Sequence, residues 1–258
     1  MTIELHSVTY GYTETLPIFK DFQWWVEDGE TWAVIGPSGC GKSTLLYLLA
    51  GIRQPNAGEV VVKGETITRP RPRTGLILQD YGLLPWETVH QNVTLGLRVR
   101  EFYGPDGTHA PSDEEVREIN ARADHWIARL GLENVAGQYP GQISGGQRQR
   151  TAIARTLALN PDVLLMDEPF ASLDAPTRES LQKLVLQLRA EHQMTAIIVT
   201  HSIEEAAFLG KKILLLGKPP NWQAQVIANP RAGGDDYLNS PAYVDVCNHL
   251  RLTLEAVV

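Results

Sequence analysis

The stretch that decides the fold is T-W-A-V-I-G-P-S-G-C-G-K-S-T, at residues 31–44. Residues 31–35 are typical of a short buried strand, and residues 42–50 have the character of a helix that ends at Gly51. Between them, residues 36–43 match the pattern G-x-x-x-x-G-K-[ST], which forms a phosphate-binding loop when it joins a strand to a helix. Because both flanks are present, the sequence predicts a phosphate site in an α/β fold.

Each residue type in this loop has a physical role. Glycines let successive backbone N–H groups turn inward around phosphates, and the helix start adds its positive dipole end. We expect Lys42 to reach the β- and γ-phosphates, Ser43 to bind Mg²⁺ through its hydroxyl, and Thr44 to donate to the α-phosphate. The bland alternative, a turn that only connects strand to helix, fits the spacing and context poorly. The predicted phosphate contacts are Gly36, Pro37, Ser38, Gly39, Cys40, Gly41, Lys42, Ser43 and Thr44.

Cys40 lies close to the predicted helix start, where a thiolate is favoured. We interpret it mainly as a structural residue of the loop. Its position nevertheless predicts that a maleimide labels this thiol and blocks binding of the phosphate ligand, and that the bound ligand protects it.

Length and composition exclude several classes of protein. The chain has 258 residues, of which 43% are apolar and 21% charged, the usual mixture for one large globular domain or two small ones. Its two cysteines, Cys40 and Cys247, cannot form a disulfide framework or a cysteine-based metal cluster within one chain, which favours a reducing compartment. The apolar runs are shorter than the roughly 18 residues of a membrane helix, and no signal peptide is readable, so we expect a cytosolic chain.

The charge balance argues against nucleic acid as a partner. Lysine plus arginine number 23 against 30 aspartates plus glutamates, which gives 23 − 30 = −7. Duplex-DNA binding requires clustered basic residues, and no such block stands out.

Strand-to-helix transitions recur along the chain, which indicates an α/β fold. Buried strands are predicted at residues 163–166, 195–199 and 212–216, and the alternating segments 3–10 and 59–63 predict an antiparallel addition at one edge. A helical subdomain is predicted at residues 87–160, and a Pro/Gly-rich connection with a short terminal helix after residue 218. Within the subdomain, residues 112–115 have capping-box spacing and precede a core-facing stripe, namely Val116, Ile119, Ala123, Trp126, Ile127 and Leu130.

An acidic pair, Asp167-Glu168, follows the predicted strand at 163–166. Open α/β sheets bind ligands at the carboxyl ends of their strands. Asp167 is therefore expected to hold Mg²⁺ through its water shell, and Glu168 to polarise the attacking water as a general base. Such a pair alone is often only a solvated loop, but here it accompanies a phosphate loop.

The segment I-S-G-G-Q-R-Q-R at residues 143–150 is the most diagnostic. Ser144 and Gln147 have capping-box spacing, so a helix start with exposed N–H groups follows Ile143 and forms a second anion site. At this point the chain resembles the nucleotide-binding subunits of ATP-binding-cassette (ABC) transporters, whose signature is L-S-G-G-Q followed by R-Q-R. Ile143 replaces the usual leucine.

The resemblance covers roughly residues 3–217 and implies further roles. Gln79 matches the Q-loop glutamine, which contacts Mg²⁺ and the attacking water, and residues 172–174 match the D-loop at the interface between two copies. His201 matches the switch histidine that contacts the γ-phosphate. Tyr12 matches the aromatic that stacks on adenine, although Tyr10 would point the same way from a strand.

The resemblance also implies an architecture. It is that of a P-loop NTPase cassette with a RecA-like core, an antiparallel β edge and an inserted helical subdomain. We expect a single ABC ATPase domain over residues 1–258, with catalytic core at 1–86 and 161–217, helical subdomain at 87–160 and a C-terminal extension at 218–258.

In the family, two copies bind head to tail, with each ATP between one phosphate loop and the other copy's signature. The residues expected to act across that interface are Ser144, Gly145, Gly146, Gln147 and Asp174.

An apolar cluster at residues 80–86, D-Y-G-L-L-P-W, follows Gln79 directly. Exposed apolar patches usually mark partners, and in ABC importers this region faces the membrane subunit. The L-L-P-W part resembles cassettes of the nitrate, sulfonate and taurine importers. The alternative is that Leu83, Leu84 and Trp86 only pack the subdomain hinge.

The sequence therefore predicts the ATPase subunit of an importer for a small solute. The implied partners are a second copy, separate integral membrane permease subunits and an extracytoplasmic solute-binding protein, with the chain peripheral at the cytoplasmic face of the inner membrane. The rival is a soluble non-transport ABC ATPase of iron–sulfur assembly, DNA repair or translation; a small-molecule kinase leaves Ser144–Gln147 and His201 unexplained. Two departures from the family are Ser202, where many relatives have Asp, and Lys211-Lys212, where Asp-Arg is common.

Overall fold

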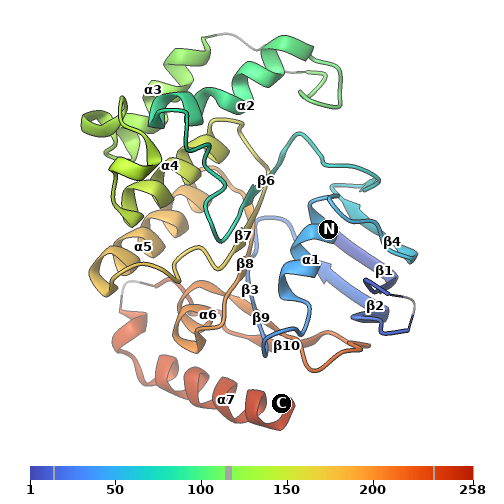
Figure 1. Cartoon of the computed structure of the whole chain (residues 1–258). Coiled ribbons are helices and arrows are strands. Elements are labelled where there is room, and N and C mark those ends of the chain that lie inside the picture. Colours follow the sequence, from blue (N-terminus) through green and yellow to red (C-terminus); the bar gives the residue numbers. More distant parts are fainter. Residues whose placement is uncertain (14, 114–117, 235, 258) are drawn as a thin grey trace.

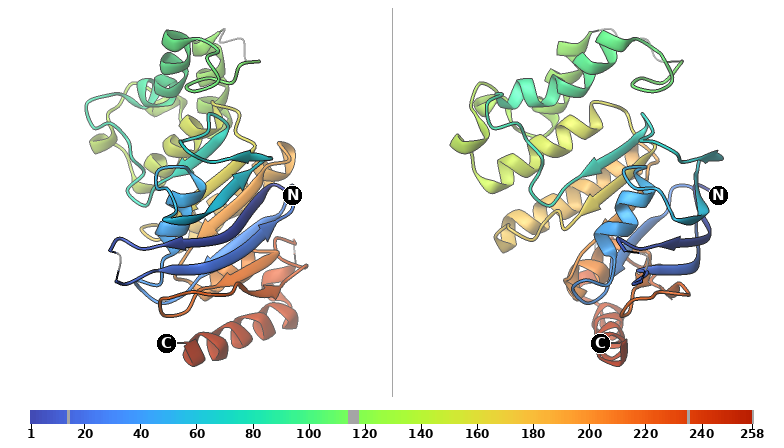
Figure 2. Two further views of the ribbon diagram at one scale, coloured as in Figure 1. Left: turned by 90° about the vertical axis from the view of Figure 1, so that its right-hand side faces the viewer. Right: turned by 45° about the vertical axis from the view of Figure 1, so that its right-hand side comes forward.

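Two β-sheets lie on either side of helix α1 (Lys42–Leu49) in the computed structural model (Figure 1). The structure describes residues 1–13, 15–113, 118–234 and 236–257. Helices of the inserted region gather at one end of the molecule and the C-terminal helix lies at the other (Figure 2). None of the helices in the described part of the chain has the length and apolar character needed to span a bilayer.

The central sheet carries the predicted parallel strands. Its order is β10-β9-β3-β8-β7-β6, and all neighbours are parallel except β10, which runs antiparallel to β9. Every residue of β3, β7 and β8 is buried, as expected for parallel strands covered on both faces. The strands are β3 (Thr31–Ile35), β6 (Thr74–Ile77), β7 (Val163–Asp167), β8 (Thr195–Val199), β9 (Lys212–Leu215) and β10 (Gln225–Ala228).

The antiparallel strands form a sheet of their own, in the order β2-β1-β4-β5, rather than extending the edge of the parallel sheet. Its apolar face packs with α1 into one core cluster. β2 was not predicted, because register shifts against β1 interrupt its alternation between Phe19 and Phe22. The strands are β1 (Ile3–Tyr10), β2 (Phe19–Val26), β4 (Ala57–Val62) and β5 (Glu65–Thr66).

The helical region contains α2 (Val89–Tyr103), α3 (Ile119–Arg129) and α4 (Gly145–Leu157), with 3₁₀ turns at Glu133–Val135 and Pro140–Gln142. α4 packs against α2, α3, β6 and α5. The predicted stripe is confirmed for Ala123, Trp126, Ile127 and Leu130, which are buried, and Ile119 packs against the same core. Val116 and the predicted capping residues Glu114 and Glu115 lie outside the described residues.

The C-terminal residues are integrated with the core. β10 extends the central sheet, and α7 (Pro241–Val257), longer than the short helix expected, packs against α6 (Ile203–Leu209). α5 (Ala175–Glu191) and a 3₁₀ turn at Tyr237–Asn239 complete this side. Buried Asn229 donates to the carbonyls of Ala207 and Gly210 at 2.6 and 2.9 Å and accepts from the Tyr237 hydroxyl at 2.5 Å.

Asn221 joins three segments that are distant in sequence. Its side-chain amide donates to the carbonyls of Ile18 at 3.2 Å and Cys40 at 2.9 Å, and its Oδ1 accepts from the Gly217 N–H at 2.9 Å. The residue is buried. It therefore links the β1–β2 connection, the phosphate loop and the end of β9.

Asn221→Ala should lower the free energy of unfolding by about 2–4 kcal/mol, because it leaves several buried polar groups without partners. ATP affinity should fall as well, since the Cys40 carbonyl belongs to the phosphate loop. Urea denaturation and nucleotide titration measure the two effects. Asn120→Ala, at an exposed position of α3, is the control and should change stability by less than about 0.5 kcal/mol. Equal unfolding midpoints for Asn221→Ala and the wild type would contradict the assigned role.

Candidate active site

The phosphate loop connects the carboxyl end of β3 to α1, as predicted. Two of its glycines are required by geometry. Gly41, the N-cap of α1, has φ +109°, and a Cβ there would lie 2.4 Å from Cγ2 of Ile18. A Cβ on Gly36 would lie 2.3 Å from the carbonyl oxygen of Leu216. No side chain fits at either position, so the loop backbone is held close against its surroundings.

Lys42 lies inside the curve of the loop. Its ammonium donates to the carbonyls of Gly36 at 2.8 Å and Pro37 at 3.0 Å, and the residue is buried. The positive charge is therefore already placed at the loop where phosphate charge is expected.

The two candidate tyrosines differ in accessibility. Tyr10 is 6% exposed, whereas Tyr12 is 58% exposed. The Tyr12 hydroxyl lies 3.3 Å from Oγ1 of Thr44, and the Arg53 guanidinium lies over its ring at 5.7 Å. Of the two tyrosines, Tyr12 is the accessible one beside the loop, which supports the choice of Tyr12 for adenine stacking.

The main interpretation of Cys40 as a structural residue is supported, whereas the thiolate expected from its position near the helix start is contradicted. The residue is 1% exposed, and burial raises the pKa of its thiol, an effect that nearby Lys42 only partly offsets. A helix start favours a thiolate only where solvent or a partner can stabilise the charge. Cys40 is a buried structural residue of the loop.

Asp167 has the environment of a metal ligand. It is the last residue of β7, is 4% exposed, and its Oδ1 has no hydrogen-bond partner among the described residues. Burial raises the pKa of this carboxyl; the hydrogen bond from Ser43 lowers it, and the charge of Glu168 raises it further. A buried, incompletely paired carboxylate beside a hydroxyl is a suitable oxygen donor set for Mg²⁺.

Glu168 and His201 form a hydrogen-bonded pair. Oε2 of Glu168 lies 2.7 Å from Nδ1 of His201, which follows β8. Glu168 has φ +45°, a conformation that favours glycine, and its N–H donates to the Val199 carbonyl at 2.9 Å. Strained backbone at a strand end is typical of residues placed for function. The parallel sheet thus brings these two predicted site residues together.

Gln79 follows β6, the neighbour of β7, and is exposed. The loop after it is fixed by contacts that were not predicted. Arg155 of α4 donates to the carbonyls of Tyr81 at 2.8 Å and Gly82 at 2.6 Å, and the Tyr81 hydroxyl lies 2.5 Å from Oγ of Ser172. These bonds connect the Gln79 loop to both the signature helix and the D-loop. No local sequence signal marks them, since each partner lies more than 70 residues away.

The signature segment starts α4 as predicted. Ser144 Oγ accepts from the Gln147 N–H at 3.2 Å, and Gln147 Oε1 accepts from the Ser144 N–H at 2.8 Å, so the capping box is confirmed. Asp174 caps α5 by accepting from the Thr177 N–H at 3.1 Å, and that bond lowers the pKa of its carboxyl. A Cβ on Gly146 would lie 2.7 Å from Cγ2 of Thr177, so the two helix starts approach closely.

Among the described residues, the signature helix and the phosphate-loop helix have different main packing partners. α1 packs against β4, β7 and β8, whereas α4 packs against α2, α3, β6 and α5. The two predicted phosphate-binding helix starts therefore belong to different layers of the molecule.

Comparison with known proteins identifies the family. The family described as ABC transporter matches residues 19–171. The chain belongs to the ABC transporter family. The aliphatic sulfonates import ATP-binding protein SsuB of Bacillus cereus is 38% identical to this cassette over 232 residues, which are 89% of this chain and 86% of that protein. The bicarbonate transport ATP-binding protein CmpD of Synechocystis is 37% identical over 255 residues, 96% of this chain and 86% of that protein.

Solved structures show the same ABC fold. CbiO1 of Clostridium perfringens, part of the ABC transporter complex cbiONQ, aligns with a TM-score of 0.75 at 25% identity and covers 98% of this chain and 96% of that one. The ATP-binding cassette MJ0796, solved as a dimer in a post-hydrolysis state with ADP and Pi, aligns with a TM-score of 0.73 at 31% identity, with 88% and 98% of the chains covered. The predicted resemblance, fold class and ATPase activity are thereby confirmed, and the non-transport alternative is not favoured.

Asp167→Asn should raise the melting temperature of the nucleotide-free protein, because it removes a buried charge that lacks full compensation. It should also weaken ATP binding about tenfold or more in Mg²⁺ while leaving binding in EDTA nearly unchanged. The folded state raises the pKa of Asp167, so folding favours its protonated form. The melting temperature of the wild type should therefore fall as pH rises through that pKa. The difference in melting temperature between Asp167→Asn and the wild type should grow over the same range.

Thermal denaturation across pH and ATP titration with and without Mg²⁺ measure these effects. Asp245→Asn, at an exposed position of α7, is the matched control. A lower melting temperature for Asp167→Asn with an unchanged Mg²⁺ response would exclude this role.

Proposed function

We propose that this protein is the ATPase subunit of an ABC importer and works as a two-fold dimer beneath separate membrane-spanning subunits. The observation that carries the proposal is the separation of the two phosphate-binding helix starts, α1 and α4, within one chain. A nucleotide that contacts both must lie between two copies. The dimeric structure of the related MJ0796 supports this arrangement.

The chemistry follows from the residues at the strand ends. Lys42 and the loop N–H groups bind the β- and γ-phosphates, and Ser43, Gln79 and Asp167 are the proposed Mg²⁺ site. Mg²⁺, when bound, offsets the charge that develops on the phosphate oxygens.

In the proposed mechanism, Glu168 orients the attacking water and accepts its proton. This carboxylate lies at the carboxyl edge of β7, beside the loop. His201 lies 2.7 Å from Glu168 Oε2, and we assign it the contact with the γ-phosphate that the family resemblance implies.

The partner copy completes the site. In the proposed dimer, Ser144, Gly145, Gly146 and Gln147 approach the γ-phosphate bound by the other copy, with the exposed N–H groups of the α4 start as donors. Asp174 lies at the same interface. ATP binding then closes the pair, and hydrolysis reopens it.

The membrane partner is proposed to contact the loop after Gln79. Leu83 packs against the core, whereas Trp86 is 70% exposed. Buried Asn92 fixes this loop by hydrogen bonds to the backbone of Leu84, Glu87 and Thr88. The hinge-packing alternative therefore applies to Leu83, and Trp86 remains available to a permease subunit.

We place the complex at the cytoplasmic face of the cell membrane, with an extracytoplasmic binding protein delivering the solute. A net charge of −7 does not favour nucleic acid as a partner. The relatives named for aliphatic sulfonate and bicarbonate transport support a small anion as the solute.

Glu168→Gln should bind Mg-ATP but hydrolyse it at least about a hundredfold more slowly, because the amide cannot accept the proton. The trapped nucleotide should hold the dimer together. Steady-state phosphate release and light scattering in excess Mg-ATP measure both effects, and Glu133→Gln, on an exposed turn, is the control. A Glu168→Gln protein that stays monomeric in Mg-ATP would rule out the sandwich dimer.

Trp86→Ala should leave the melting temperature nearly unchanged, because most of the side chain is in water. It should reduce recovery of a polytopic membrane protein when the tagged chain is purified from gently solubilised membranes. Leu83→Ala, in contrast, should lower the melting temperature, since this side chain packs on the core. Recovery of only soluble proteins with the wild-type chain would instead favour a non-transport ABC ATPase.

A further inference from the structure

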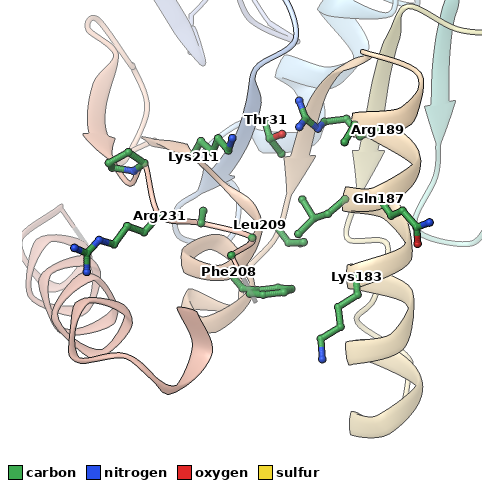
Figure 3. A pocket seen from close by; sticks show the side chains of 14 residues that line it. Thr31, Lys183, Gln187, Arg189, Phe208, Leu209, Lys211 and Arg231 are labelled. Atoms are coloured by element: carbon green, nitrogen blue, oxygen red, sulfur yellow. The ribbon is translucent and has the colours of Figure 1, made fainter. Parts of the chain in front are cut away.

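A pocket of about 700 Å³ lies at the sheet edge opposite the phosphate loop (Figure 3). Its walls come from the second half of α5, the end of α6, the amino end of β3 and residues 230–234 after β10. None of the residues given a role in nucleotide binding lines it. Its volume falls in the range of small-molecule sites, about 300–1,000 Å³.

The pocket is cationic in a protein of net charge −7. Four basic side chains line it, and no lining residue among those described is acidic. In Figure 3, Lys211 and Arg189 extend toward Thr31 from opposite sides, whereas the guanidinium of Arg231 points away from the pocket. The polar end of the pocket is therefore formed by Thr31, Arg189 and Lys211. The four basic residues are Lys183, Arg189, Lys211 and Arg231.

This polar end contains donors without partners. Thr31 is 1% exposed, and its Oγ1 makes no hydrogen bond within the described residues. Arg189 donates to the Gly29 carbonyl, but its buried Nε is likewise unpaired, and burial lowers the pKa of its guanidinium with no carboxylate to oppose the effect. Buried donors are normally satisfied, so these atoms indicate a group that is to be bound. An oxyanion can accept from all of them.

One wall of the pocket offers apolar surface, supplied by Leu186. Leu186 is only partly buried, whereas the neighbouring lining residues Phe208, Leu209 and Ala232 are already covered by the core. A small inorganic anion would leave this surface in water. An apolar body attached to the oxyanion would cover it and gain the free energy of burial.

We propose that this pocket binds a small organic anion. A carboxylate, sulfonate or phosphate group lies between Arg189, Lys211 and the hydroxyl of Thr31, and the apolar part lies against Leu186. The site is separate from the nucleotide site, and residues 230–234 form one of its walls.

Isothermal titration of the full-length protein with hexanoate, hexanesulfonate and hexyl phosphate tests the proposal. Hexanol, which lacks the charge, and sulfate, which lacks the apolar part, are the matched probes. At least one hexyl anion should bind about tenfold or more tightly than either control, since hydrogen bonds to charged groups and apolar burial both contribute. Saturating Mg-ATP should not displace it. Hexanol binding as tightly as the anions, sulfate binding as tightly as the hexyl anions, or displacement by ATP would overturn the proposal.

Thr31→Val tests the effect of the hydroxyl on anion affinity separately from its effect on the melting temperature. Valine has the same shape and suits a strand, so the melting temperature should stay equal or rise when the unpaired hydroxyl is removed. Affinity for the hexyl anion should fall about fivefold. Lys211→Gln should weaken binding similarly, whereas Lys218→Gln, an exposed lysine outside the pocket, should not. Wild-type affinity in both Thr31→Val and Lys211→Gln would exclude an anion at this position.

Discussion

The phosphate loop keeps its curve because two other segments approach its glycines more closely than any side chain would permit, and a third contact is a hydrogen bond to its backbone. Leu216 at the end of β9 contacts Gly36, and Ile18 contacts Gly41. Asn221 bonds the loop carbonyl of Cys40. With the backbone fixed in this way, the Lys42 ammonium and the start of α1 take the positions that phosphate binding requires. The other proposed catalytic groups act on phosphates whose position this loop determines.

Sheet order then sets the distance over which the chemistry takes place. β8 lies between β3, which carries the loop, and β7, which carries the carboxylates. Neighbouring strands are about 4.8 Å apart, so β3 and β7 are about 10 Å apart. The end of β8 supplies His201 in the gap, and its contact with Glu168 bridges part of that width. The hydrogen bond from Ser43 to Asp167 spans the same separation, so the end of the loop and the acidic strand end already meet there.

Short sequence patterns predicted the parts of the site whose residues lie close together in the sequence. The loop with its flanking strand and helix, the capping box of Ser144 and Gln147, and the carboxylates after β7 all depend on spacings of a few residues. Contacts between distant segments could not be read in this way. The irregular alternation of β2, the burial that inverts the expected chemistry of Cys40, and the bonds of Arg155 to the Gln79 loop all arise from tertiary packing.

The C-terminal residues show the largest difference between pattern and structure. The composition predicted a Pro/Gly-rich connection and a short terminal helix, yet the described residues after 218 reach both edges of the central sheet. Asn221 bonds to the phosphate loop at the carboxyl edge, and Asn229 anchors the chain next to the basic pocket at the amino edge.

β10 joins these two anchors through its pairing with β9, and β3 connects the same two edges from Thr31 to Gly36. The wall of the basic pocket at residues 230–234 thus belongs to a segment whose other end bonds the phosphate loop through Asn221. Any coupling between the two sites would pass through paired strands rather than through a flexible tail.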